Sequence, residues 1–385
     1  GVTARGGRVG GIGGGFNGSL TNANSTGSVT AGSNYVGGLV GLFYSGSLTQ
    51  SSATGAVTST GGQQIGGLVG QYNVGGGTIS DSFATGSVTA NSSNGYFVGG
   101  LVGYLSQGAV TRAFATGNVL AGMHYVGGLV GYADNNSGTI SNVYATGNVT
   151  STSGEQIGGL IGRSERTVIS ALATGNVTAA SHYVGGLVGV SYRSVIASQS
   201  TGSVTATGSD RRYVGGLIGY QEGGSYTVSD SSHIGGAVSG GNSYVGGLIG
   251  KVNGSSVVGS YATTSVTGAG DFVGGLIGWT NGSVSGRSTV TSAQTFTYNP
   301  ANGNPTASIT TTATDFGNNV SYASGAVTGR NDVGGLVGRA DSSTVITNAY
   351  YGGTGGVGSV SAERNYGGLI GFLTPGATVT NSHYN

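Results

Sequence analysis

The 385-residue chain contains no cysteine, three prolines and few charged residues, and each shortage excludes a class of protein. Without cysteine, neither a disulfide framework nor a thiolate metal site is possible. Charged residues make up 6% of the chain and its net charge is +1, so the clustered Lys and Arg that bind nucleic acid are missing. No apolar run reaches the roughly 18 residues that predict a membrane-spanning helix. We therefore expect no nucleic-acid partner and no membrane insertion.

Glycine, in contrast, is abundant: the chain has 84 glycines, alongside many Ser, Thr and Asn. Such a composition predicts disorder when it has no period, and a repeat architecture when it has one. The string Tyr-Val-Gly-Gly-Leu-Val-Gly at residues 35–41 recurs with a spacing of 27 to 33 residues, apart from one gap of 60. We interpret that gap as two periods with one degraded copy. The leucines of the repeat are Leu39, Leu68, Leu101, Leu129, Leu160, Leu187, Leu217, Leu248, Leu276, Leu336 and Leu369.

A second string, such as Ala-Thr-Gly-Ala-Val at residues 53–57, follows each leucine after a short alternating stretch. Each repeat therefore has three short β-like segments, and no helical period persists. A repeat of this length cannot bury a core alone, but stacked copies can. The sequence predicts an all-β fold: a right-handed parallel β-solenoid of 12–13 coils of roughly 30 residues. We expect one solenoid over residues 1–385, and we interpret it as part of a longer chain.

Stacking would place like residues in columns, with apolar side chains inside and Ser, Thr and Asn outside. The repeated leucines from Leu39 to Leu276 should form one buried column. Glycines should supply turns that need a positive φ. Val36 and Leu39 are three residues apart and would face opposite sides of a regular strand. A bulge at Gly37-Gly38 would turn both inward, whereas the alternative is a strand covered on both faces.

The string Val-Gly-Gly-Leu-[Val/Ile]-Gly followed by Ala-Thr-Gly-[Asn/Ser]-Val resembles the GLUG motif. The resemblance covers nearly the whole chain, from Val9 to Gly371. Such motifs occur in bacterial surface proteins, including filamentous-haemagglutinin-like adhesins. The resemblance implies export, a solenoid and an adhesive or structural role, and it carries over no catalytic residues.

Residues 287–322 depart from the pattern and contain Pro300 and Pro305. We expect an irregular coil or a protruding loop there. Its single carboxylate, Asp315, has no histidine beside it within the stretch, so the stretch lacks an internal acid–base pair.

Some parallel β-helices cleave polysaccharides, so carboxylate pairs were considered. Asp81 and Asp230 share one register, but five coils would separate them by about 24 Å. Paired glycosidase carboxylates lie roughly 5 to 9.5 Å apart, so this pair fails. Another column places His124, Glu155 and His182 on consecutive coils, where they form either a metal site or a solvated polar edge. We assign no catalytic residue, no metal and no cofactor.

Two outward columns are rich in aromatic residues. Row 1 precedes the motif, and row 2 follows its last glycine. Row 1 is Tyr35, Gln64, Phe97, Tyr125, Gln156, Tyr183, Tyr213, Tyr244 and Phe272, and row 2 is Leu42, Gln71, Tyr104, Tyr132, Arg163, Val190, Tyr220, Lys251 and Trp279. Stacked rings and cation–π contacts that stabilise neighbouring coils are one interpretation. The other is a surface for a glycan or a partner, formed by Tyr104, Tyr132, Tyr220 and Trp279.

These observations favour a non-catalytic structural or adhesive shaft of a bacterial surface protein, located outside the cell. Its partners would be a glycan or protein on a host or neighbouring cell, or further copies of itself joined end to end. One alternative is a subunit that assembles into an extracellular filament. A second alternative is a polysaccharide-cleaving β-helix enzyme.

Overall fold

The computed structural model describes the chain except residues 33, 91–95, 123, 136–137, 208–212, 287–292, 298–307, 313–319, 353–357 and 385. For residues 293–297 and 308–312 only the backbone is described. The chain divides into two compact units. Unit 1 comprises residues 1–175 and 296–310, and unit 2 comprises residues 176–295 and 311–385.

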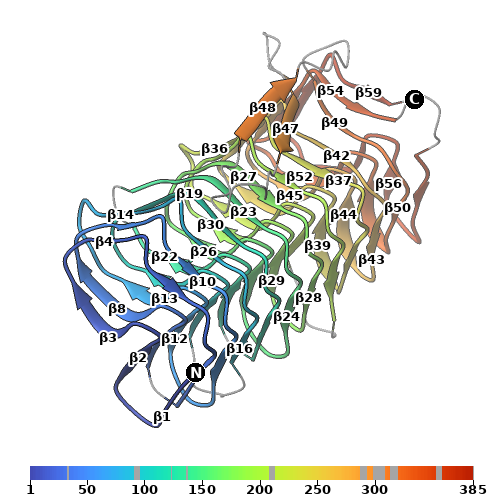
Figure 1. Ribbon diagram of the computed structural model, residues 1–385. Helices are drawn as coiled ribbons and strands as arrows, with labels where there is room; N and C mark the ends of the chain where they lie inside the picture. Colours follow the sequence, from blue (N-terminus) through green and yellow to red (C-terminus); the bar gives the residue numbers. More distant parts are fainter. Residues whose placement is uncertain are drawn as a thin grey trace. The chain divides into compact units, whose positions relative to one another are not determined.

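All regular elements of the described residues are strands, and each coil passes in turn through four sheets, A, B, C and D (Figure 1). In unit 1, sheet A contains β1 (Val2–Ala4), β6 (Val29–Ala31), β11 (Val57–Ser59), β16 (Val88–Ala90), β20 (Val119–Ala121) and β24 (Val149–Ser151). Sheet B contains β2 (Arg8–Gly10), β7 (Tyr35–Gly37), β12 (Gln64–Gly66), β17 (Phe97–Gly99), β21 (Tyr125–Gly127) and β25 (Gln156–Gly158). Sheet C contains β3 (Gly13–Asn17), β8 (Val40–Ser45), β13 (Val69–Tyr72), β18 (Val102–Leu105), β22 (Val130–Ala133) and β26 (Ile161–Ser164). Sheet D contains β4 (Leu20–Thr21), β5 (Asn24–Ser25), β9 (Leu48–Thr49), β10 (Ser52–Ala53), β14 (Thr78–Ser80), β15 (Phe83–Ala84), β19 (Ala109–Ala115), β23 (Ile140–Ala145) and β27 (Val168–Ala173).

Unit 2 repeats the same order of sheets. Sheet A contains β28 (Val177–Ala179), β33 (Val204–Ala206), β38 (Val238–Gly240), β43 (Val266–Gly268), β50 (Val327–Thr328) and β55 (Val360–Ser361). Sheet B contains β29 (Tyr183–Gly185), β34 (Tyr213–Gly215), β39 (Ser243–Gly246), β44 (Asp271–Gly274), β51 (Asn331–Gly334) and β56 (Tyr366–Gly367). Sheet C contains β30 (Val188–Ser191), β35 (Ile218–Glu222), β40 (Ile249–Asn253), β45 (Ile277–Thr280), β52 (Val337–Ala340) and β57 (Ile370–Leu373). Sheet D contains β31 (Val195–Ile196), β32 (Gln199–Ser200), β36 (Thr227–Ser229), β37 (Ser232–Ile234), β41 (Ser256–Val258), β42 (Tyr261–Thr263), β46 (Ser283–Ser285), β49 (Ser321–Ala323), β53 (Val345–Thr347), β54 (Ala349–Tyr351), β58 (Thr378–Thr380) and β59 (His383–Tyr384).

The predicted all-β parallel solenoid is confirmed. Strands of successive coils pair in parallel and in register, so that Val29 pairs with Val57 and Ile65 with Val98. Figure 1 shows such strands side by side, for example β22 and β26. Each unit contributes six strands to each of sheets A, B and C, and the solenoid has about 11 turns of about 30 residues.

The gap of 60 residues is not two coils, as the spacing suggested. The Leu276 amide donates directly to the Leu336 carbonyl at 2.8 Å, and β45 pairs with β52. The extra residues enter within one coil, between β46 and β49. They include β47 (Ala293–Thr297) and β48 (Ser308–Thr312), which form a two-stranded sheet. Most of the irregular stretch expected at 287–322, including Asp315, lies outside the described residues.

The leucine column is confirmed. The leucines from Leu39 to Leu160 in unit 1, and from Leu187 to Leu276 in unit 2, have no exposed surface. Within each unit the amide of one leucine donates to the carbonyl of the next, as from Leu68 to Leu101 at 2.9 Å. The following residue donates to the same carbonyl, as Val69 does at 3.0 Å. The column therefore combines apolar burial with a shared backbone acceptor.

The paired glycines of the motif form a corner, so the expected bulge within one strand is wrong. Sheet B ends at Gly37 and sheet C begins at Val40, and both Val36 and Leu39 are buried. Neither glycine has a positive φ. A Cβ on Gly37 would lie 2.0 Å from the Val40 carbonyl oxygen, and one on Gly38 would lie 2.2 Å from the Gly67 carbonyl oxygen. Glycine is required because backbones approach closely there.

Positive φ angles occur elsewhere among the described residues, on turn glycines such as Gly46, Gly76 and Gly108, as expected, and also on residues with a side chain. In unit 1 a column of them bends sheet D once per coil, with φ between 48° and 55°. These residues are Asn22, Gln50, Asp81, Arg112, Asn142 and Ser170. Asn and Asp tolerate this left-handed conformation best among residues with a Cβ. The expectation that glycines would supply the positive φ is therefore wrong for the motif and for this column.

Serine is also not confined to the outside, contrary to expectation. Ser51, Ser82, Ser198 and Ser231 are buried. The Ser82 hydroxyl accepts the Ser51 amide at 3.1 Å and donates to the Ser80 carbonyl at 2.8 Å. A buried hydroxyl can replace a carbonyl of the ladder because it both donates and accepts.

One buried position in sheet D holds a histidine. His233 is in register with Ser200 and Ala262, and it has no exposed surface. Its Nδ1 lies 3.0 Å from the Ser200 hydroxyl, and its Nε2 lies 2.7 Å from the Gly236 carbonyl oxygen. Ser200 and His233 are both fully buried, so a substrate cannot reach the serine hydroxyl. Burial lowers the pKa of His233 to about 4.

We predict that Leu160→Ala lowers the free energy of unfolding by about 2–5 kcal/mol, because it empties a filled position of the core. Leu120→Ala is the matched control, because Leu120 is 41% exposed on sheet A of the same unit. Denaturant unfolding followed by circular dichroism measures both. Equal effects of the two changes would contradict the burial of the leucine column.

A second prediction concerns the glycine corner. Gly100→Ala should destabilise unit 1 by at least about 1–3 kcal/mol, since its Cβ would lie 2.0 Å from the Gly128 carbonyl oxygen. Gly6→Ala should be nearly neutral, because nothing lies within 4 Å of that position. Thermal unfolding of the two variants tests this, and a tolerated Gly100→Ala would refute the close-approach argument.

A third prediction concerns pH. The pKa of His233 is lower in the folded chain than the ordinary value of about 6.5, so the unfolded chain binds more protons between those values. Stability should therefore be complete above pH 6.5 and fall as pH drops toward 4, by about 3 kcal/mol at most. His233→Ala, which matches the alanine of the next coil, should flatten this part of the stability curve. An unchanged slope in the variant would disprove the assignment.

Candidate functional site

Rows 1 and 2 lie side by side on the outside of the glycine corner, and their rings contact one another. In unit 1, the Phe97 ring centroid lies 4.8 Å from that of Tyr104 and 5.5 Å from that of Tyr132. In unit 2, Tyr213 lies 5.4 Å from Tyr220. Row 1 projects from sheet B and row 2 from sheet C, so the corner between these sheets brings the two rows together. We call the combined surface the aromatic strip. The sequence alone predicted two separate rows and not their contact.

Within the strip, rings also stack from coil to coil. Tyr104 and Tyr132 lie 5.4 Å apart with an interplanar angle of 16°, and Tyr183 and Tyr213 lie 4.9 Å apart at 13°. Near-parallel stacking covers ring faces and leaves edges and polar tips toward solvent. The strip thus stabilises neighbouring coils. A partner would meet mainly ring edges and hydroxyl groups.

The four predicted contact residues are all half-buried in the strip: Tyr104, Tyr132, Tyr220 and Trp279. Tyr104 and Tyr132 belong to unit 1, and Tyr220 and Trp279 belong to unit 2. Contact of these residues with a glycan or a protein stays a prediction.

Cations lie over the rings, which confirms the expected cation–π contacts. The Arg163 guanidinium lies 5.3 Å from the Tyr132 ring centroid. The ammonium of Lys251 lies 4.6 Å from Trp279 and 5.5 Å from Tyr220. Each contact joins residues of adjacent coils and places a positive charge against a ring.

Carboxylates line the same strip, and the sequence interpretation did not identify them. The Tyr104 hydroxyl donates to Asp134 at 2.7 Å, and the Tyr132 hydroxyl donates to Glu165 at 2.8 Å. Arg163 pairs with Glu165 at 2.5 Å. Burial, and then the neighbouring carboxylates, raise the pKa of both tyrosines, so these phenols are neutral.

A sequence signal for these carboxylates does exist. An acidic residue lies two positions after a member of row 2, where alternation returns the side chain to the same face of the strand. Glu165 follows Arg163 in this way. Arg339 is in register with Trp279 and so continues row 2, and Asp341 follows it and contacts it at 2.9 Å. Reading this third row beside the other two would have predicted the ion pairs.

Arg166 is a further polar residue that the sequence did not single out. It is 1% exposed, and its guanidinium donates to backbone carbonyls of Asp134 at 2.8 Å, Leu105 at 3.2 Å and Gly108. Burial lowers its pKa to about 10. Arg166 therefore joins three coils of unit 1, and it is not open to a ligand.

The polar edge that suggested a metal site holds a weak pair. His124 Nδ1 lies 3.7 Å from Glu155 Oε1, and both side chains are about half exposed. Tyr96 stacks on His124 at 5.4 Å. Among the described residues, no group of three His, Cys, Asp or Glu could hold a metal ion.

Asp81 and Asp230, the pair of carboxylates that share one register, belong to different units. Asp81, in unit 1, receives two hydrogen bonds from Arg112, at 2.7 and 2.8 Å, which lower its pKa. Asp230 belongs to unit 2. Asp315 lies outside the described residues.

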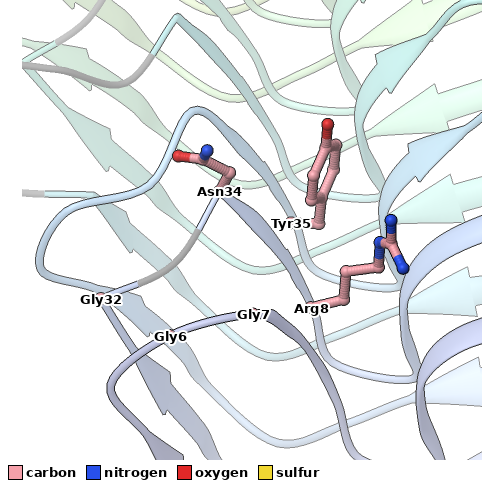
Figure 2. A pocket seen from close by; sticks show the side chains of 6 residues that line it. All are labelled: Gly6, Gly7, Arg8, Gly32, Asn34 and Tyr35. Atoms are coloured by element: carbon pink, nitrogen blue, oxygen red, sulfur yellow. The ribbon is translucent and has the colours of Figure 1, made fainter.

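One open pocket of about 420 Å³ lies at the first two coils of unit 1 (Figure 2). Figure 2 shows the Arg8 and Tyr35 side chains close together, with the Asn34 amide to one side. The lining residues are Gly6, Gly7, Arg8, Gly32, Asn34 and Tyr35. They include no carboxylate and no histidine, so the lining offers no acid–base pair.

Parts of the repeat sequence are shared with known proteins. The model of the GLUG motif matches residues 32–58 and 123–150. Over 176 residues, or 43% of the chain, the sequence is 39% identical to halomucin of Haloquadratum walsbyi (strain DSM 16790 / HBSQ001). The chain spans about 2% of the length of that relative. No solved structure matches, and the described residues form no helix of the length and hydropathy needed to cross a membrane. The chain is a parallel β-solenoid repeat protein that carries GLUG motifs.

Proposed function

We propose that this chain is a shaft segment of an extracellular surface protein, and that it makes adhesive contacts along its sides without catalysis. The observation that carries the proposal is the in-register stacking of near-identical coils. Such stacking builds long faces with repeated side chains and few concave sites. The GLUG motifs and the similarity to a stretch of halomucin support a place at the cell surface.

The chemistry of the described side chains also supports a passive role. The acidic residues of the aromatic strip bond to tyrosine hydroxyls and arginines, as Glu165 does with Tyr132 and Arg163. The Ser200–His233 pair is buried. Catalysis requires a base within reach of a substrate in a pocket, and the pocket at Arg8 has none.

The test uses the purified chain on a surface. We expect it to retain cells or glycan-coated beads, to appear as separate particles by electron microscopy, and to release no sugar from polysaccharides. Release of reducing ends would favour the enzyme alternative, and long fibres would favour the filament alternative. Either result would overturn the proposal. Gly100→Ala is a control for retention, because it should disturb the stacking on which the surface depends.

A further inference from the structure

We propose that the pocket at Arg8 binds an anionic sugar, in which a carboxylate or sulfate group pairs with the Arg8 guanidinium. The inference rests on the proposed adhesive function and names a ligand class for one site. It starts from the position of Arg8 at the beginning of β2. Val9 is buried, so alternation along the strand turns Arg8 outward, and Arg8 is exposed.

Arg8 occupies the place of an aromatic residue in row 1, because it is in register with Tyr35 of the next coil. Its guanidinium lies 5.9 Å from the Tyr35 ring centroid and 5.1 Å from that of Tyr44. The row 2 position of the same coil is Gly15, where later coils have larger side chains. The Arg8 side chain lies against this glycine, since a Cβ there would be 3.7 Å from Arg8 Cδ. The rings therefore hold the guanidinium in place from one side.

Arg8 lacks the carboxylate counter-ion that the other arginines of the strip have. Arg163 pairs with Glu165 at 2.5 Å, and Arg339 pairs with Asp341 at 2.9 Å. These carboxylates lie two residues after row 2. In the first coil that place, two residues after Gly15, is taken by the neutral Asn17. In the described part of the chain, none of the ion pairs within 4.0 Å involves Arg8. Its positive charge is held by two rings and is available to an external anion.

The remaining lining suits a sugar ring. The loop at Gly6 and Gly7 leaves open space, because a Cβ on either glycine would meet nothing within 4 Å. The Asn34 amide both donates and accepts, as sugar hydroxyl groups require. A volume of about 420 Å³ lies within the usual range of small-ligand sites. Arginine binds planar carboxylates through two parallel hydrogen bonds, which favours a uronic acid over a neutral sugar.

Isothermal titration calorimetry of the whole chain with oligogalacturonate tests the proposal. Neutral oligosaccharides of the same length and sulfated oligosaccharides form the other arms. We expect oligogalacturonate to bind, neutral sugar to bind at least tenfold more weakly, and added salt to weaken binding. Tighter binding of the sulfated arm would identify the anion as sulfate. Binding of no anionic sugar, or equal binding of neutral sugar, would overturn the proposal.

Arg8→Gln should weaken binding at least tenfold, and Arg8→Lys should restore only part of it. Arg5→Gln is the matched control, because Arg5 is exposed three residues earlier but does not line the pocket. Circular dichroism should be unchanged in all three. Equal loss in Arg5→Gln and Arg8→Gln would indicate general charge attraction and refute the site.

If Arg8→Gln abolishes sugar binding while cells are never retained, the proposed adhesive function fails and this site stands. If cells are retained and no anionic sugar binds, the adhesive function stands and the proposed site at Arg8 fails.

Discussion

The close approach of successive backbones at the glycine corner is the constraint on which the rest of the structure depends. A Cβ on Gly67 would lie 2.0 Å from the Gly100 carbonyl oxygen, so no other residue fits without moving a whole coil. At this distance each coil can only follow the path of its neighbour. Register is thereby fixed for sheets B and C, and the leucine that follows the glycines is placed above the previous leucine. The buried column is a consequence of the corner as much as of the hydrophobic effect.

The same constraint explains where the chain tolerates change. The long insertion leaves from sheet D, between β46 and β49, while β44 pairs directly with β51 and β45 with β52. Sheet D already varies along the chain. Its bends take residues as different as Asn, Gln, Asp, Arg, Ser and Ala, and some coils have one strand where others have two. An insertion at the glycine corner would separate backbones that must touch. An insertion in sheet D lengthens a bend and leaves sheets A, B and C paired.

The columns could be predicted from the sequence because period and residue type are properties of the sequence alone. The repeated leucines fixed the fold class and the buried column. Spacing could not show why the glycines are there, because a positive φ and a close approach both demand the same residue. Spacing also could not explain the gap of 60 residues, because an insertion inside one coil and an additional degraded coil lengthen the gap equally. The two aromatic rows were visible, but their contact depends on the angle between sheets B and C. That angle arises from the packing at the corner.

Near-identical coils present the same side chains along each face, so a local binding site requires a coil that differs from its neighbours at an outward position. In the aromatic strip two of these differences are compensated within the coil, because Arg163 and Arg339 each pair with a carboxylate two residues later. Such pairs contribute little free energy at the surface, and they leave no charge for a partner. Where a neutral residue takes that place, as Asn17 does in the coil of Arg8, the cation over the rings has no carboxylate partner among the described residues. Under our proposal, the same side chains then serve as a recognition site and not only as a contact between coils.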